Sequence, residues 1–273
     1  MTKTVLITGA SSGFGKETAK LFQKNGWNVI ATMRSPEKEN ELTQLDNVFV
    51  TELDVENIES IQKGVKAGAE KFGTINALIN NAGYGLMGVF ESASSEQIRK
   101  QYAVNVFGLM EVTQTVLPYL RASGGGTIVN ISSVAGNVAF PFGCFYNSTK
   151  FAVEGLSEAL SHELAALNIV VKIVEPGAIA TNFRSSGKMI QSDIPEYNAT
   201  AALSKFMERL GAATAHLPKA TAVDVANTIY EAVTDGKFQL RYIIGEDAKF
   251  FIDLKKKSND QDFIKQMRSY FID

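Results

Sequence analysis

The sequence predicts an α/β fold, a single doubly wound parallel sheet with helices on both faces. Short apolar, β-branched runs alternate along the chain with amphipathic helical patterns, an order that produces parallel strands joined by helices. The strand-like runs are apolar at nearly every position, as strands covered on both faces must be. With 273 residues, 45% of them hydrophobic and 21% charged, the chain is long enough for one large domain over residues 1–273.

The first half of the chain supplies four of the strand-like runs. They occupy residues 4–7, 28–31, 48–50 and 77–79. The helical patterns between and after them cover residues 16–25, 57–72 and 95–120. Gly26 follows the first of these helices and fits a C-terminal stop. This order predicts repeated strand–helix units that build one side of the sheet.

The second half continues the alternation and then breaks it. Further strands are expected at 126–131, 170–174 and 241–244, with a helix at 151–167 whose leucines recur every four residues. Residues 185–221 contain Pro195 and Pro218 around a short helical piece, and a segment of this kind more often forms a pocket wall or lid than a plain connector. Residues 249–273 are expected to form a C-terminal surface helix with Lys255–Lys257 on its solvated face, or alternatively a membrane-touching amphipathic tail.

Composition excludes several classes of function. The formal net charge of −2 provides no basic field for nucleic acid. The single cysteine, Cys144, and two distant histidines, His162 and His216, supply neither a disulfide nor a metal site. The absence of an apolar stretch of about 18 residues predicts no membrane span, and a strand that begins at Thr4 leaves no room for a signal peptide. A cytoplasmic protein without a metal is therefore expected.

The stretch VLITGASSGFG, residues 5–15, admits two interpretations. Gly9 to Gly13 spell the G-x-S-x-G of a hydrolase nucleophile elbow, in which Ser11 would act with His216. Three glycines between a strand and a helix also suit a loop that holds a dinucleotide phosphate against backbone N–H groups. The phosphate loop is favoured because an elbow usually follows a later, central strand. Its candidate cofactor residues are Gly9, Ser11, Ser12, Gly13, Phe14 and Gly15.

The residue that follows the second strand bears on the choice of cofactor. NAD-binding folds of this kind place an acid there, where it holds the ribose 2′-hydroxyl. This chain has Ala31-Thr32-Met33-Arg34 instead, and a guanidinium suits a 2′-phosphate. NADP(H) is therefore expected rather than NAD(H), the alternative being that Arg34 is a solvated loop residue.

A tyrosine and a lysine lie near the start of the helix that follows the fifth strand. Tyr146 and Lys150 are four residues apart and share a helix face. The preceding strand delivers Ser132 and Ser133 to the sheet edge that also carries the glycine loop. A hydroxyl, a phenol and an ammonium gathered beside a dinucleotide loop suit proton transfer during carbonyl reduction or alcohol oxidation.

These motifs together resemble the short-chain dehydrogenase/reductase family, in family order over residues 4 to about 184. Thr8 to Gly15 resemble its cofactor loop, Asn80-Asn81-Ala82-Gly83 its N-N-A-G motif, and Tyr146-Asn147-Ser148-Thr149-Lys150 its active-site motif, with Ser133 thirteen residues before the tyrosine. The resemblance implies a Rossmann-like fold. Within the family, the sequence is most similar to the hydroxysteroid and retinol dehydrogenase and carbonyl reductase branch. The further cofactor residues that it implies are Asp54, Val55, Asn81, Ala82, Gly83, Tyr146, Lys150, Pro176, Gly177, Ile179 and Thr181.

The resemblance also implies a role for each catalytic residue. Tyr146 would donate the proton to the substrate oxygen, or accept it in the oxidation direction, and Lys150 would favour the phenolate by its charge and bind the nicotinamide ribose. Ser133, with Ser132 as its neighbouring competitor, would hydrogen-bond the substrate oxygen. Asn105 would hold a water that links Lys150 to solvent, or alternatively cap or kink its helix.

The expected substrate pocket is apolar. Its candidate walls are Tyr84, Val138, Phe140, Phe142, Cys144, Ile179, Phe183, Met189 and Tyr197, some of which are expected to be ordinary core. Such walls favour a hydrophobic ketone, aldehyde or alcohol. The family resemblance implies a homodimer or homotetramer. A non-catalytic NADP-sensing protein that kept the fold remains an alternative.

Overall fold

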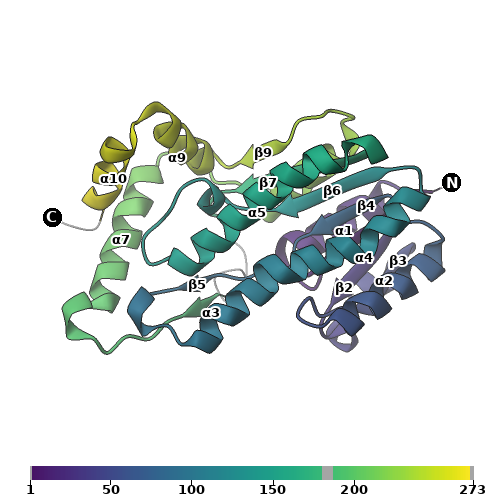
Figure 1. The fold of residues 1–273 in the computed structure, drawn as a ribbon, viewed down its shortest axis with the longest axis horizontal. Helices are drawn as coiled ribbons and strands as arrows, with labels where there is room; N and C mark the ends of the chain where they lie inside the picture. Colours follow the sequence, from purple (N-terminus) through teal and green to yellow (C-terminus); the bar gives the residue numbers. More distant parts are fainter. Residues whose placement is uncertain (1, 180–186, 271–273) are drawn as a thin grey trace.

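The computed structural model describes residues 2–179 and 187–270, and residues 1, 180–186 and 271–273 lie outside the described part (Figure 1). Seven parallel strands form the central sheet in the order β3-β2-β1-β4-β6-β7-β9. The strands are β1 (Thr4–Thr8), β2 (Asn28–Met33), β3 (Val48–Glu52), β4 (Ala77–Asn80), β6 (Gly126–Ile131), β7 (Ile169–Pro176) and β9 (Arg241–Ile244). The predicted doubly wound sheet is confirmed.

The strand order reverses between β1 and β4, which pair directly with Ile7 opposite Ile79. In sheets of this type the loops that leave the carboxyl ends of the two central strands separate there, and ligands bind in the resulting crevice. The loop after β1 is the glycine loop and the loop after β4 begins with Asn81. The switch point of the sheet therefore coincides with two of the predicted motifs.

Helices cover both faces of the sheet because side chains alternate along each strand. Val5 and Ile7 of β1 pack in the apolar cluster beneath α1 (Gly13–Lys24) and α8 (Ala222–Thr234). Leu6 packs on the opposite side, in the cluster beneath α2 (Ile58–Phe72), α4 (Gly108–Ala122) and α5 (Cys144–Glu163). In Figure 1, α4 and α5 cross in front of the sheet. The core is therefore split into two layers by a buried parallel sheet.

The helical pattern predicted over residues 95–120 is confirmed and contains a local change of pitch. The helix α3 (Ser95–Tyr102) runs into a π-helical segment, Ala103–Phe107, and then into α4. Short 3₁₀ turns lie elsewhere at Pro36–Lys38, Leu42–Gln44, Phe90–Ser92, Val134–Gly136, Ala165–Leu167 and Pro195–Tyr197. Such π-segments cluster at functional sites, and this one carries Asn105.

The segment after β7 returns to the edge of the sheet. Its strand β8 (Lys188–Met189) pairs in parallel with β5 (Leu86–Met87), which follows the loop after β4. Its helix α7 (Ala199–Thr214) lies beside α10 (Asp260–Ser269), at the left of Figure 1. The described part of the predicted insertion thus packs against both the N-terminal half and the C-terminal tail.

The prediction of one C-terminal surface helix is wrong. The tail forms two helices, α9 (Glu246–Lys257) and α10, because Asn259 caps a new helix with its side chain. Phe251 and Ile252 of α9 are buried against Val138, and Lys255 donates a hydrogen bond to the carbonyl oxygen of Asn137. The tail is part of the apolar core, and Lys255 is not a purely solvated charge.

One aromatic cluster closes the edge of the sheet where β2 begins. Trp27, the only tryptophan of the chain, packs edge-on against Phe22 with ring centroids 5.1 Å apart. The ammonium of Lys3 lies 5.5 Å from the Trp27 ring centroid. This cluster lies at the amino ends of the strands, opposite the glycine loop. Among the described residues, no helix is both long and apolar enough to cross a membrane.

Candidate active site

The glycine loop has the backbone that its sequence predicts. Gly9 adopts a φ of +68°, a conformation that costs energy for residues with a side chain. A Cβ at Gly15 would lie 2.5 Å from the Gly9 carbonyl oxygen and 2.5 Å from the Asn81 side-chain nitrogen. The two glycines therefore allow a turn tighter than any other residue permits.

The neighbouring loop after β4 braces this turn. The side-chain nitrogen of Asn81 donates to the carbonyl oxygens of Thr8 and Gly9 at 2.9 and 3.1 Å. The Thr8 hydroxyl accepts hydrogen bonds from the backbone N–H groups of Asn81 and Ala82, both at 3.0 Å. Asn81 and Ala82 thus hold the shape of the cofactor loop from the other side of the switch point.

The start of α1 fits a bound phosphate. Ser12 is the N-cap residue, and its side chain caps no helix N–H group. The first turn contains no acidic residue, and Ser11 and Ser12 are exposed. Within the described ranges no hydrogen bond engages the Ser11 or Ser12 hydroxyl. These hydroxyls, the N–H groups of the first helical turn and the positive end of the helix dipole form an environment that favours an anion.

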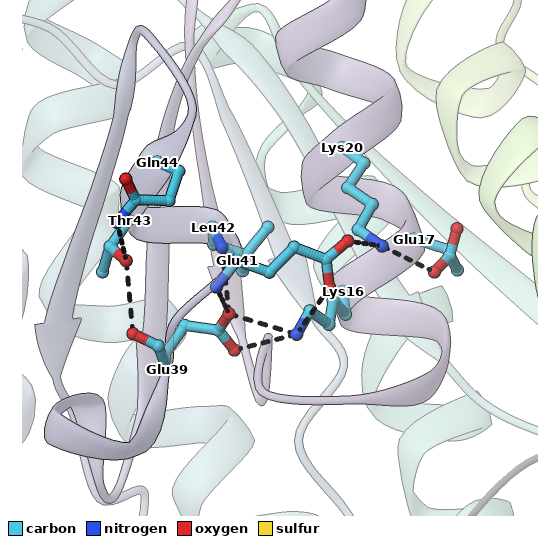
Figure 2. Close-up of polar contacts among 8 residues, drawn as sticks. All are labelled: Lys16, Glu17, Lys20, Glu39, Glu41, Leu42, Thr43 and Gln44. Atoms are coloured by element: carbon cyan, nitrogen blue, oxygen red, sulfur yellow. Dashed lines mark hydrogen bonds and ion pairs between the residues drawn. The ribbon is translucent and has the colours of Figure 1, made fainter.

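Arg34 lies directly after β2 and is exposed. Beside it, the connector from β2 to β3 is tied to α1 by a network of charges (Figure 2). The Glu39 carboxylate accepts hydrogen bonds from the N–H groups of Glu41 and Leu42 at 2.8 and 2.9 Å, and its Oε1 lies 3.1 Å from Lys16 Nζ. Glu41 pairs with Lys16 at 3.0 Å and also with Lys20.

This network leaves Lys16 and Lys20 neutralised, whereas no ion pair engages Arg34 within the described ranges. Sequence reasoning missed Glu39, which lies five residues beyond Arg34 and whose burial is not readable from local pattern. Asp54 and Val55 follow β3 nearby, and the Asp54 carboxylate accepts a hydrogen bond from the N–H of Glu56 at 3.1 Å. The network therefore fixes the connector while Arg34 faces solvent.

Ser133, Tyr146 and Lys150 come together at the carboxyl end of β6. The hydroxyls of Ser133 and Tyr146 are hydrogen-bonded to each other. Lys150 Nζ donates to the carbonyl oxygen of Ile131 at 2.8 Å and lies 5.7 Å from the centroid of the Tyr146 ring. The geometry places a phenol between a hydroxyl and an ammonium.

Burial sets the protonation of the two titratable groups. It raises the pKa of the Tyr146 hydroxyl to about 12, while the hydrogen bond from Ser133 acts in the opposite direction. Burial lowers the pKa of the Lys150 ammonium to about 8, and the charge of Glu154 opposes that change. Tyr146 is therefore a protonated donor at neutral pH in the protein alone, and a further positive charge is needed to make it a base.

Asn105 is held by the loop that follows β4. Its side-chain amide donates to the Tyr84 carbonyl oxygen at 2.9 Å and accepts from the Tyr84 N–H at 3.1 Å. It also donates to the Thr149 hydroxyl at 3.2 Å. A Cβ at Gly83 would lie 3.2 Å from Asn105 Oδ1 and 3.9 Å from Lys150 Nζ, so these three residues are neighbours.

The segment after β7 is fixed by a residue of α9. Asp247 accepts a hydrogen bond from the Ala178 N–H at 2.7 Å and packs on Gly177. The Ser133 hydroxyl is 3.4 Å from the Pro176 carbonyl oxygen. Ile179 is buried in the core, and the predicted Thr181 and Phe183 lie outside the described residues. Sequence reasoning missed Asp247 because nothing local links it to Gly177.

Comparison with known proteins decides the family. The family model described as short chain dehydrogenase matches residues 3–191. This chain belongs to the short-chain dehydrogenase family. It is 39% identical over 243 residues to an uncharacterized oxidoreductase of Schizosaccharomyces pombe, covering 86% of this chain and 98% of that protein. A short-chain dehydrogenase from Streptomyces avermitilis has a similar structure, with a TM-score of 0.83, 30% identity and coverage of 98% and 95% of the two chains.

Solved structures with similar folds hold both nicotinamide cofactors. A 3-ketoacyl-(acyl-carrier-protein) reductase from Brucella melitensis is complexed with NADH, at a TM-score of 0.76, 25% identity and coverage of 89% and 96%. The protein ElxO is bound to NADP, at a TM-score of 0.72, 29% identity and coverage of 89% and 98%. The similar structures therefore bind nicotinamide cofactors. One holds NADH, which lacks the 2′-phosphate, and the other holds NADP, which carries it.

Within this short-chain dehydrogenase the two adjacent serines face different surroundings. The Ser132 hydroxyl is buried without a hydrogen-bond partner in the described structure, and a Cβ at Gly136 would lie 2.5 Å from it. Ser133 instead contacts Tyr146. The geometry therefore favours Ser133 over Ser132 as the serine of the site.

The predicted pocket walls divide into two groups. Val138 and Phe140 belong to the cluster beneath α9, where Phe140 packs edge-on against Phe251 at 5.3 Å between ring centroids, so these two are core residues. Cys144, Met189 and Tyr197 are exposed, and Tyr84 and Phe142 are partly buried. The Phe142 carbonyl oxygen accepts a hydrogen bond from the Gly88 N–H at 2.6 Å. This contact links the segment just before α5 to the residue that follows β5.

The hydrolase alternative finds no support in this short-chain dehydrogenase. Ser11 and His216 are both exposed, and no hydrogen bond joins them in the described ranges. His162 is also exposed, on the surface of α5. Over the same ranges, no group of three or more His, Cys, Asp or Glu side chains is arranged to hold a metal ion.

Proposed function

We propose that this protein is an NADP(H)-dependent carbonyl reductase or alcohol dehydrogenase for a hydrophobic substrate. The observation that carries the proposal is the Tyr146 hydroxyl, hydrogen-bonded to Ser133 and flanked by the Lys150 ammonium. This group lies at the same sheet edge as a glycine loop built for a phosphate. Proton transfer beside a dinucleotide is the chemistry that this arrangement supports best.

The side chains divide the work of carbonyl reduction between them. When bound, the nicotinamide supplies the hydride that the carbonyl carbon receives, or takes it back in oxidation. The Ser133 hydroxyl orients the substrate oxygen, and the protonated Tyr146 donates its proton to that oxygen. Lys150, with the positive charge of the oxidised cofactor, favours the phenolate that remains, so that Tyr146 accepts a proton when the reaction runs toward the ketone. We propose Asn105 as the fourth catalytic residue, supporting proton exchange at Lys150.

We propose residues of this chain for each part of the cofactor. Ser11, Ser12 and the first turn of α1 would hold the phosphates, with Gly9, Gly13, Phe14 and Gly15 shaping the loop. Asp54 and Val55 would contact the adenine, while Ala82 and Gly83 with Pro176, Gly177, Ile179 and Thr181 would contact the nicotinamide end. Arg34, unpaired within the described ranges, would hold the 2′-phosphate, which supports NADP(H) over NAD(H).

The residues that we propose for the substrate pocket are mostly apolar or aromatic. The candidate wall residues at least partly exposed in the described structure carry aromatic, sulfur and methylene groups: Tyr84, Phe142, Cys144, Met189 and Tyr197. Such a wall favours a hydrophobic ketone or aldehyde, or the matching alcohol, over a phosphorylated substrate. We propose that residues 185–221, with Phe183 just before them, form the outer wall of this pocket within a single domain of residues 1–273.

A turnover assay tests the proposal. Purified protein is mixed with NADPH and a panel of ketones, aldehydes and steroids, and oxidation of NADPH is followed by its absorbance. Turnover of apolar ketones faster with NADPH than with NADH is expected. Tight NADPH binding with no turnover across the panel would favour a cofactor-sensing protein instead. We also propose a homodimer or homotetramer, which light scattering tests.

A further inference from the structure

One face of α5 carries a row of ionisable groups that ends at the exposed His162. Tyr146, Lys150, Glu154 and Glu158 are spaced by four residues, so each lies one turn beyond the last. Lys150 and Glu154 are 7% and 6% exposed, whereas Glu158 is exposed. A Cβ at Gly136 would lie 3.1 Å from the Lys150 carbonyl oxygen and 3.0 Å from Glu154 Cγ. A buried glutamate therefore lies one helical turn beyond the proposed catalytic lysine on the same face of α5.

A second buried acid meets Glu154 from the sheet. Glu175 of β7 is 1% exposed and shares a side-chain hydrogen bond with Glu154. Two ionised carboxylates have no proton to share, so this contact requires one protonated carboxyl group. Glu154 Oε1 is buried and has no hydrogen-bond donor among the described residues. A protonated Glu175 carboxyl group would supply that donor. Burial and the charge of Glu154 raise the pKa of the Glu175 carboxyl to about 7, which identifies Glu175 as the proton carrier.

One cation serves both acids. Arg241 Nε lies 3.0 Å from Glu154 Oε2 and 3.4 Å from Glu175 Oε1, and its terminal nitrogen pairs with Glu158 at 2.7 Å. Asn137 donates to Glu175 at 3.1 Å. The charged groups that surround Glu154 are Lys150 and Glu158 of α5, Glu175 of β7, Arg241 of β9, and Lys255 of α9 through the Asn137 carbonyl.

The balance of these charges points toward Lys150. With its proton, Glu175 is neutral, and the guanidinium of Arg241 is shared between Glu154 and the exposed Glu158. Among the residues described, Glu154 is the acid whose charge favours the Lys150 ammonium. Burying two carboxyl groups is costly unless they are paired, which makes a purely space-filling role for this pair a poor explanation.

We propose that Glu154 is a positioning residue whose carboxylate keeps Lys150 in its ammonium form beside Tyr146, while a proton on Glu175 and the ion pair with Arg241 maintain that single negative charge. The inference rests on the proposed function of Tyr146 and Lys150. It adds a buried carboxylate, one helical turn beyond Lys150, whose charge favours the ammonium form of the lysine. A neutral Lys150 would no longer favour the Tyr146 phenolate, so alcohol oxidation is the direction most affected.

The direct test measures Lys150 without any substrate or cofactor. Protein labelled with ¹³C at the lysine Cε is titrated by NMR, and the Lys150 signal is assigned with Lys150→Arg. Glu154→Gln is expected to lower the pKa of Lys150 by about one unit or more, since a buried charge one helical turn away is removed. Glu158→Gln is the matched control, because it also loses an Arg241 contact but is exposed, and it should leave the Lys150 titration unchanged.

Glu175→Gln completes the set because glutamine mimics a protonated glutamate. It is expected to move the Lys150 titration by less than half the shift of Glu154→Gln. An equal or larger shift would overturn the assignment of the charge to Glu154. If Glu154→Gln does not fold, Glu154→Asp, which keeps the charge, replaces it: a Lys150 titration close to that of the wild type supports the proposal, and a fall like that expected for glutamine refutes it.

A kinetic arm separates the two proposals. Glu154→Gln should lower kcat/KM for alcohol oxidation about tenfold near pH 8 and displace its pH profile toward alkaline values, since one pKa unit corresponds to a factor of ten. Glu158→Gln should keep the wild-type profile. Wild-type protein without turnover would refute the proposed function, while the NMR titration would still decide the coupling. An unchanged Lys150 titration in Glu154→Gln would refute the inference even in an active enzyme.

Discussion

At the scale of single residues, Tyr146 is the side chain on which the proposed chemistry depends. Its hydroxyl is protonated at neutral pH and bonded to Ser133, so Tyr146→Phe removes the proton donor while keeping the ring. We expect kcat to fall by about 10²- to 10⁴-fold, the usual contribution of general acid catalysis, with NADPH affinity retained. Steady-state kinetics and fluorescence titration with NADPH measure the two quantities. A variant with near wild-type kcat would contradict the role.

Arg34 carries the expected cofactor preference. Arg34→Asp should lower the ratio of kcat/KM for NADPH to that for NADH by about ten- to a hundredfold, the equivalent of one or two charge-assisted hydrogen bonds. Lys38→Asp, an equally exposed cation on the same connector, is the control for a general loss of positive charge. A ratio that responds to Lys38 as strongly as to Arg34 would argue for a diffuse electrostatic effect.

Sequence spacing predicted which residues of the candidate site lie together, but it missed the residues that support them. Ser133, Tyr146 and Lys150 lie close along the chain and on one strand–helix unit, so periodicity brings them together. Glu154 follows the same helical period, but its partner Glu175 is contributed by a different strand. Asp247 likewise reaches Gly177 from a distant helix. Contacts of this kind depend on tertiary packing, which no local pattern encodes.

At the scale of elements, the connector from β2 to β3 is held on α1 by Glu39. Glu39→Gln loses charge-assisted bonds from two N–H groups and from Lys16, and should lower the free energy of unfolding by about 1–3 kcal/mol. Because Arg34 lies on the same connector, KM for NADPH should rise with little change in kcat. Urea unfolding and steady-state kinetics measure the two effects.

The same carboxylate predicts a dependence on pH. Burial alone would raise the pKa of Glu39, but the N–H groups of Leu42 and Glu41 and the Lys16 ammonium outweigh it and lower the pKa. The stabilisation is therefore present above the pKa of an unfolded glutamate and is lost as pH falls through the folded value. The difference between wild type and Glu39→Gln should shrink in acid. Glu41→Gln, at an exposed site, should change stability far less, and an equal loss would refute the burial argument.

The elements themselves differed in how far the sequence could define them. Parallel strands buried on both faces must be continuously apolar, and all seven predicted strands are confirmed. The helix over residues 95–120 was predicted, but its π-helical segment at Ala103–Phe107 was not, because the apolar period continues through it. The tail was misjudged since its partner Val138 lies more than a hundred residues earlier in the chain.

At the scale of the whole molecule, a buried ion pair joins the far edge of the sheet to α8. Lys172 of β7 lies 2.5 Å from Asp235, which follows α8, and the Tyr242 hydroxyl of β9 donates to Asp235 at 2.6 Å. Asp235→Asn leaves a buried ammonium without its counter-charge and should cost about 3–5 kcal/mol. The double variant Lys172→Met with Asp235→Asn should recover part of that loss. Equal stability of the single and double variants would show that the two groups are not coupled.

Asp235 also makes the global stability sensitive to acid. Burial would raise its pKa, but hydrogen bonds from Lys172, Tyr242 and the Lys237 N–H prevail and lower the pKa to about 2. The unfolded value is near 3.9, so the contribution is complete above that pH and is lost as pH falls through about 2. Thermal unfolding from neutral to acid pH should show wild type and Asp235→Asn converging at the acid end. If the stabilities of the two proteins instead fell in parallel with pH, the acid sensitivity would come from groups other than Asp235.

The chain holds one tryptophan and one cysteine, and the fold has placed them at opposite edges of the sheet. Trp27 is packed against Phe22 at the amino ends of the strands, while Cys144 is exposed at the first turn of α5, two residues before Tyr146. The unmodified protein therefore carries one tryptophan, which can be excited selectively over the eight tyrosines and senses unfolding at a distance from the site. A single thiol-coupled dye would sense the mouth of the site. Spectroscopy on this molecule can thus separate loss of structure from events at the site, without a single residue being changed.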